Sequence, residues 1–193
     1  MPRKRSLVCA VLACLWVGTS VGGLATAQEP DVSAITQLIV RGDHAAALLE
    51  AQKLEATTKA QFGTNHTSYA YVLNVLATVY LVQEKFDEAE GLYRRAMAIR
   101  EQVLGEDHLE VAHTLINLSL VYSLQRKFAQ AEEILRRALK IQEKALGEND
   151  PTIAPTLGLI ASACLGQGKR QEADALHARG KSIIDMARER KPP

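Results

Sequence analysis

A repeat of 42 residues constrains the fold of this chain more than any other feature of its sequence. A turn-like motif with glycine at its second position recurs at residues 62–66, 104–108 and 146–150. Between the motifs the same side chains return in register, for example Leu73, Leu115 and Leu157, then Ala89, Ala131 and Ala173, then Ile99, Ile141 and Ile183. Self-similarity at a fixed period of this length predicts stacked supersecondary units that share one core.

Each unit contains two amphipathic helical patterns joined by a short polar link. In the first unit, apolar residues recur with a helical period from Leu73 to Tyr80 and again from Phe86 to Ile99. The link at residues 83–85 predicts a turn between the two helices. Small residues on both helices, such as Ala77 and Ala89, would let the two backbones approach each other closely. Neither helix can bury its apolar stripe alone, so the units must stack.

The residues between the units predict where helices end and begin. Gly105 and Gly147 can adopt positive φ and end the second helix of a unit. Asp107 or residues 149–150 are then expected to cap the next helix, and Pro151 suits a first helical turn.

These fragments resemble the tetratricopeptide repeat, and the 42-residue period resembles its kinesin light chain-type version. The matching pieces are Leu76-Ala77 with Tyr80, residues 86–90 and residues 93–96. The resemblance implies an all-α fold, a right-handed α-solenoid of helix-turn-helix repeats. It also implies a concave groove that binds a peptide or protein segment, which would make the chain a protein-binding scaffold.

The sequence predicts six segments along the chain. They are a signal peptide at 1–27, a divergent N-terminal repeat-like unit at 28–66, repeat one at 67–108, repeat two at 109–150, repeat three at 151–187, and a basic C-terminal tail at 188–193.

The N-terminal segment predicts export to the periplasm or secretion. Cations at residues 3–5 precede an uncharged, mostly apolar run at 7–24, and the small residues Ala25-Thr26-Ala27 then suit cleavage after Ala27. One alternative is an uncleaved membrane anchor, and another is lipoprotein processing at Cys14. Either alternative would make the protein a membrane-anchored accessory subunit of an envelope complex. Membrane association is therefore expected only if the segment is retained or lipidated.

The resemblance implies that the first helix of each repeat lines the groove. The candidate ligand contacts in repeats one and two are Tyr71, Asn74, Thr78, Leu81, His113, Ile116, Asn117 and Leu120. In repeat three the same face carries Pro155, Gly158, Ser162 and Leu165. Asn74 and Asn117 each match one asparagine of the family's Leu-Asn-Asn-Leu-Ala segment, where an amide can donate to and accept from a bound backbone. Asn74 could instead cap or bridge neighbouring helices.

Charge balance argues against a nucleic-acid ligand. The chain has 23 Lys plus Arg against 22 Asp plus Glu, a formal net charge of +1, and phosphate binding needs a concentrated surplus of cations. One basic column recurs in every unit: Lys53, Arg95, Arg137 and Arg179. It is either a solvated helix face or a ladder for an acidic partner. The candidate groove positions carry no paired Lys or Arg, so the groove favours apolar and aromatic anchors over an acidic tail.

The sequence predicts no catalytic residue, no metal site and no cofactor. It contains no Gly-rich phosphate loop, no His-Glu-x-x-His and no Gly-x-Ser-x-Gly motif. His66 and His108 occupy equivalent junctions between units, so their recurrence follows from the repeat. Cys164 lies on a packing stripe and is expected in the core. A hydrolase that uses groove carboxylates is the remaining enzymatic alternative.

The C-terminal edge lacks a further helix to cover it. Apolar residues at Leu176, Ile183, Ile184 and Met186 precede the basic tail. Because terminal repeats must hide or use their outer faces, we expect this edge to be covered by self-association or by a partner.

Overall fold

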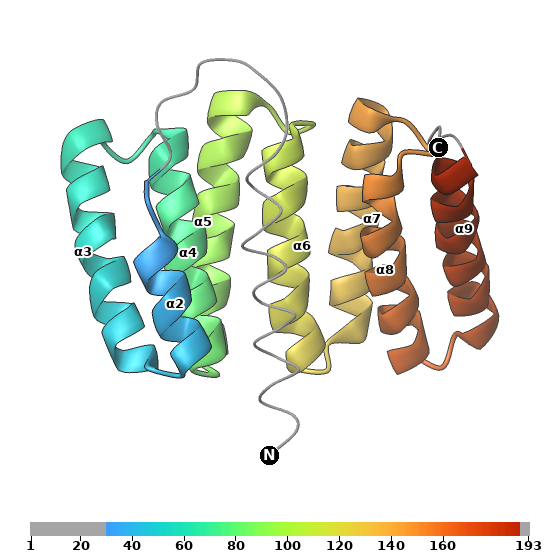
Figure 1. Ribbon diagram of the computed structural model, residues 1–193, viewed down its shortest axis with the longest axis horizontal. Helices are drawn as coiled ribbons and strands as arrows, with labels where there is room; N and C mark the ends of the chain where they lie inside the picture. Colours follow the sequence, from blue (N-terminus) through green and yellow to red (C-terminus); the bar gives the residue numbers. More distant parts are fainter. Residues whose placement is uncertain (1–29, 190–193) are drawn as a thin grey trace. The chain divides into compact units, whose positions relative to one another are not determined.

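The computed structural model describes residues 30–189, and the predicted signal peptide lies outside them. The chain divides into two compact units, residues 1–106 and residues 107–193, and each is considered by itself. Within the described residues all regular structure is helical, and no strand is present (Figure 1). The predicted all-α class is therefore confirmed.

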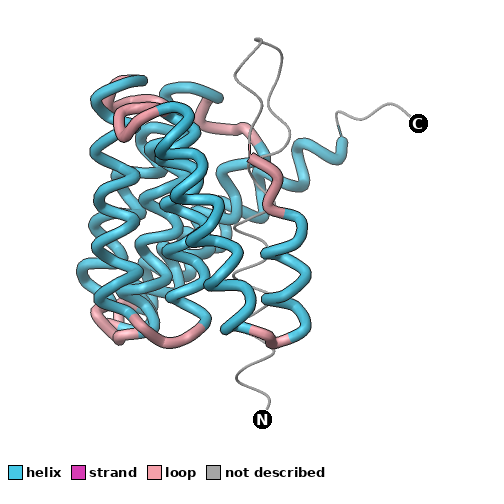
Figure 2. Tube along the Cα trace, turned by 90° about the vertical axis from the view of Figure 1, so that its left-hand side faces the viewer, coloured by secondary structure: helices cyan, strands magenta, loops and turns pink. Residues whose placement is uncertain are grey.

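The first unit contains two helical hairpins. Its helices are α2 (Ser33–Arg41), α3 (His44–Phe62), α4 (Thr67–Val82) and α5 (Phe86–Leu104). The second unit contains two more: α6 (Leu109–Leu124), α7 (Phe128–Leu146), then a 3₁₀ turn η1 (Pro151–Ile153), α8 (Ala154–Gly166) and α9 (Arg170–Glu189). Within each unit, helices that follow one another in the chain pack side by side, and the loops lie at the helix ends (Figure 2).

The turns within the hairpins share one backbone conformation, which recurs every 42 residues. Gly42, Glu84, Arg126 and Gly168 all adopt left-handed φ angles, of 79°, 62°, 61° and 81°. Glu84 and Arg126 hold a conformation that side chains with a Cβ rarely adopt. The repeat therefore imposes the turn geometry even where glycine is absent. Between the hairpins, Gly105 and Gly147 have the positive φ angles predicted for them, 92° and 98°.

The first helix of each repeat is capped by one recurring position. The Nδ1 atom of His66 accepts from the Ser68 amide at 3.1 Å, and the Nδ1 atom of His108 accepts from the Glu110 amide at 3.2 Å. In the third repeat the Asp150 carboxylate accepts from the Thr152 amide at 2.8 Å and so caps η1, the 3₁₀ turn that leads into α8. The prediction that Asp107 caps α6 is wrong: its carboxylate forms an ion pair with Lys144 instead. The two junction histidines are thus structural acceptors.

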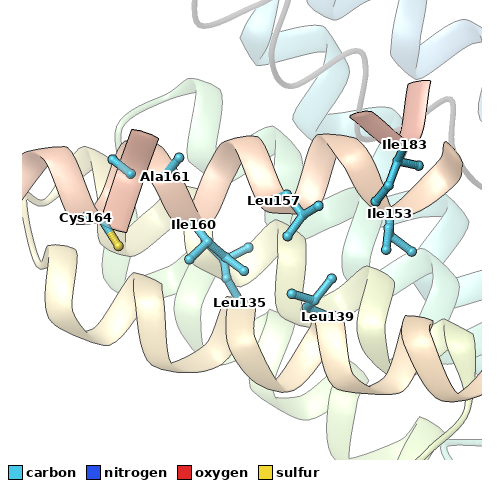
Figure 3. Close-up of a cluster of buried hydrophobic side chains, with 9 residues drawn as sticks. Leu135, Leu139, Ile153, Leu157, Ile160, Ala161, Cys164 and Ile183 are labelled. Carbon is cyan, nitrogen blue, oxygen red and sulfur yellow. The ribbon is translucent and has the colours of Figure 1, made fainter. Parts of the chain in front are cut away.

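Small residues occur where the two helices of a repeat meet. The columns 77/119/161 and 89/131/173 hold only alanine or serine, and every member is at most 1% exposed: Ala77, Ser119, Ala161, Ala89, Ala131 and Ala173. Larger side chains fill the space between repeats. In the second unit, Leu135 and Leu139 of α7 face Leu157 and Ile160 of α8 within one buried cluster (Figure 3).

The C-terminal helix turns most of its apolar residues inward. Ile183 is 1% exposed, and Leu176 and Met186 pack against the same buried cluster. Ile184 is half-buried. The apolar edge predicted at the end of the chain is therefore much smaller than expected, because α8 already covers most of it.

The capping role of His108 predicts a difference between two histidine substitutions. His108→Ala should lower the free energy of unfolding by about 1 kcal/mol, because an amide at the start of α6 loses its acceptor. His108→Asp should preserve stability, because Asp150 performs the same function in the third repeat. His177→Ala, at an exposed position of α9, is the control and should change stability by less than about 0.5 kcal/mol. Urea denaturation measures all three, and equal losses for the two alanine variants would contradict the capping role.

Candidate protein-interaction site

In the first unit the predicted ligand contacts lie on α4 and differ in exposure. Tyr71 is half-buried, whereas Asn74, Thr78 and Leu81 are buried. The Asn74 side-chain amide donates to the Ala70 carbonyl at 3.2 Å. The Thr78 hydroxyl donates to the Asn74 carbonyl at 2.9 Å and lies 2.8 Å from the Tyr93 hydroxyl. Three of these four side chains thus belong to the packed interior of the unit.

In the second unit the predicted contacts lie on α6 and are all half-buried. His113 lies with its Nδ1 atom 3.4 Å from a carboxylate oxygen of Glu110. Ile116 packs against the buried cluster that contains α8, while Asn117 and Leu120 are also partly open to solvent. The partly open positions are therefore Tyr71 in one unit and these four in the other, and their role as ligand contacts stays a prediction.

Local partners engage members of the basic column within each unit. The Arg95 guanidinium lies 5.3 Å from the centre of the Tyr69 ring. Arg179 donates to the Glu148 carbonyl at 3.0 Å and pairs with Glu143 at 2.7 Å, so it ties α9 to the turn that precedes η1. Lys53 pairs with Glu50 at 2.7 Å. These contacts give the column a local structural role.

A buried carboxylate joins two repeats in the second unit. One oxygen of Glu132 accepts from Arg136, one helical turn further along α7, at 2.8 Å. Its other oxygen accepts from the Gln167 amide and the Lys169 ammonium group, both at 2.7 Å, in the turn between α8 and α9. Burial disfavours the charged form of Glu132, but the three donors outweigh it and lower the pKa of this carboxyl to about 2.

The contact of Glu132 with the next turn was not anticipated, although the sequence carries a signal for it. Gln and Lys recur at the same turn positions in three repeats: Gln83, Gln125 and Gln167, with Lys85, Lys127 and Lys169. In the first unit the Gln83 amide donates to the His44 carbonyl at 2.9 Å, so this turn also reaches back to the preceding hairpin. The recurring Gln-x-Lys turn therefore fastens one hairpin to the one before it within each unit.

One group of metal-ligand side chains gathers within the described residues. Glu132, Cys164 and Glu172 bring their ligand atoms within 4.8 Å of one another. Arg136 pairs with both carboxylates, and Lys169 pairs with Glu132. Burial and the two nearby carboxylates raise the pKa of the Cys164 thiol, which disfavours the thiolate needed for metal binding or nucleophilic attack. This arrangement is that of an ion-pair network beside a core cysteine.

The fold and the recurring helical hairpins define the class of protein, an all-α solenoid of helix-turn-helix repeats. The tetratricopeptide repeat family model matches residues 36–102, 68–144 and 125–183, so the chain belongs to the tetratricopeptide repeat family. The 42-residue period predicted repeats of the kinesin light chain type, and solved repeats described in those terms share this fold. Repeats of this family support a protein-interaction scaffold, and proteins with this fold are typically non-enzymatic. No curated protein matches the chain significantly.

Solved structures share the fold at low sequence identity. BtubC (BKLC) from P. vanneervenii superposes with a TM-score of 0.74 at 21% identity, covering 99% of this chain and 77% of its own. Kinesin light chain TPR-like repeats from Podosopora anserina superpose with a TM-score of 0.66 at 19% identity, covering 99% and 90%. MamA superposes with a TM-score of 0.52 at 16% identity, covering 84% and 99%. At these identities the likeness concerns the fold alone.

A search of residues 30–189 for helices long and apolar enough to span a membrane found none.

The low pKa of Glu132 predicts a specific loss of stability in acid. Its pKa is lower in the folded chain than the ordinary value of 4.5, so its contribution is complete above that value and is lost as the pH falls toward about 2. Glu132→Gln should lower the free energy of unfolding at pH 7 by roughly 2 kcal/mol, a figure reduced because Lys169 is 45% exposed.

Glu133→Gln is the matched control for this experiment, because Glu133 is exposed on the next position of the same helix. Urea unfolding between pH 7 and pH 3 should show a smaller acid-induced loss in Glu132→Gln than in the wild type and Glu133→Gln. Parallel pH profiles for all three proteins would contradict the role of the buried carboxylate.

Proposed function

We propose that this protein is an exported scaffold that binds a peptide or protein segment in a concave groove of its repeats and performs no chemistry of its own. The family supports protein interaction, and the candidate positions on the first helices add the finer proposal. The observation that carries it is the partial exposure of Tyr71 on α4 and of His113, Asn117 and Leu120 on α6. Tyr71 and His113 occupy the same repeat column, 42 residues apart.

The chemistry of these side chains favours a ligand with apolar and aromatic anchors. A phenol, an imidazole, an amide and an isobutyl group can contact apolar side chains and hydrogen-bond to an extended backbone. The candidate groove positions on the first helices supply no pair of guanidinium or ammonium groups that would clamp a terminal carboxylate. The ligand is therefore an internal or neutral segment in preference to an acidic tail.

Selection from a random peptide library tests the groove. We expect enriched peptides to carry aromatic or branched apolar residues and to lose at least about tenfold in affinity with Tyr71→Ala or Leu120→Ala. Glu133→Ala, on an exposed face of α7, is the control and should leave affinity unchanged. Asn74→Ala separates the two readings of that residue, since a structural role lowers stability and leaves affinity per folded molecule intact. Peptides that bind equally to all variants would remove the groove assignment.

Export is a separate part of the proposal and rests on the pattern of residues 1–27. Intact-mass analysis of the protein from its native host should show a chain that begins at Gln28. Retention of residues 1–27, or a lipid adduct on Cys14, would instead support the alternative of a membrane-anchored accessory subunit of an envelope complex.

A further inference from the structure

A trough lies between α8 and α9 at the end of the second unit. Its volume is about 360 Å³. Gly158, Gly180 and Ile184 contribute to its floor, and His177, Lys181 and Arg188 line it with basic side chains. A Cβ atom built on Gly158 would meet nothing within 4 Å, so the trough is open above this residue.

The repeat register identifies what this trough corresponds to. One repeat earlier, Leu135 and Leu139 form a buried cluster with Leu157 and Ile160 of α8 (Figure 3). Ile116 packs against the same cluster. Moving Ile116, Leu135 and Leu139 forward by 42 residues gives Gly158, His177 and Lys181, and all three line the trough. The trough is therefore the place that the first helix of one more repeat would occupy.

The residues that line the trough are smaller or more polar than their equivalents one repeat earlier. Two leucines of the preceding repeat are replaced by His177 and Lys181, and an isoleucine is replaced by Gly158. Arg188 adds another cation, and the acidic Asp185 lies 3.8 Å from it. The surface is thus a narrow apolar floor flanked by Lys181 and Arg188, with Asp185 beside them, whereas the surface that holds α8 presents isoleucine and leucines at the equivalent positions.

We propose that the α8–α9 trough binds one amphipathic helix of a partner protein, with acidic residues on both sides of a narrow apolar stripe. The helical form follows from the register, because the equivalent surface of α6 and α7 holds α8. The acidic flanks follow from charge complementarity with Lys181 and Arg188. The narrow stripe follows from Gly158, which leaves room for a large apolar side chain because a Cβ atom there would meet nothing within 4 Å. This site is distinct from the groove proposed above and does not depend on it.

A second copy of this chain is a poorer occupant. Its first described helix is α2, with the sequence SAITQLIVR, which contains Arg41 and no Asp or Glu. Stacking α2 on the trough would place a cation near Lys181 and Arg188 and supply no acidic partner. For this trough we therefore favour an acidic helix from a different protein over α2 of a second copy, and self-association through other surfaces stays a prediction.

A matched pair of synthetic peptides tests the proposal with the full chain. Each has about 20 residues, enough for several helical turns, with a leucine and alanine stripe and a glutamine outer face. One carries glutamate on both sides of the stripe, and the other carries lysine. We expect the glutamate peptide to bind with a dissociation constant below about 100 µM and the lysine peptide at least about tenfold more weakly.

Three variants locate the binding. Gly158→Leu fills the floor and should weaken the glutamate peptide at least about tenfold, while Gly158→Ala leaves most of the floor open and should change binding little. Lys181→Glu combined with Arg188→Glu should abolish the preference for the glutamate peptide. Leucine and alanine are better helix formers than glycine, so thermal unfolding should show that both Gly158 variants remain folded.

Three results would overturn the proposal. The first is equal binding of both peptides, and the second is unchanged binding in Gly158→Leu. The third is a concentration-dependent dimer in sedimentation that Gly158→Leu abolishes, which would make a second copy the occupant. Loss of the glutamate peptide in Tyr71→Ala but not in Gly158→Leu would place it in the predicted groove, so failure here leaves the groove proposal standing.

Discussion

Within each unit of this chain, the two helical hairpins bury their apolar residues by sharing them with each other. In the second unit α8 packs against both α7 and α9, and Leu157 and Ile160 lie between the two helices' side chains. In the first unit α4 packs against both α3 and α5 in the same way. First helices are consequently apolar around much of their circumference, and second helices are amphipathic. A single hairpin would leave these residues in water, so no repeat is expected to fold alone.

Turns, helix caps and side-chain hydrogen bonds fix how the helices that share this burial are aligned. Positive-φ turns at Gly105 and Gly147 end the second helices, and a side-chain acceptor at the next junction starts the following first helix. The Gln-x-Lys turn then reaches back to the preceding hairpin, most strongly where Gln167 and Lys169 meet Glu132. Since this carboxylate is buried and paired with cations, losing either side leaves an unbalanced charge. The contact therefore fixes the position of this turn against α7.

The sequence predicted the helices and the small-residue columns because both depend on local periodicity. It did not predict the histidine caps, since Asp107 is the stronger capping residue by type and only the backbone path shows that His108 holds the position. It overestimated the apolar C-terminal edge, because periodicity shows that Leu176 and Ile183 share a stripe but not that α8 already covers it. The trough at Gly158 and Lys181 needed both the register and the structure. Its residues look unremarkable until they are compared with those that hold α8.

Residue-resolved amide hydrogen exchange tests the shared burial of the hairpins most directly. Because α8 packs on two sides and α9 mainly on one, amides of α8 should exchange more slowly than those of α9, and α4 should likewise exceed α2 in protection. The slow amides should fall at equivalent repeat positions of α4 and α8, such as Leu73 and Leu157. Protection that does not favour these two helices within their units, or equal exchange in α8 and α9, would contradict the account.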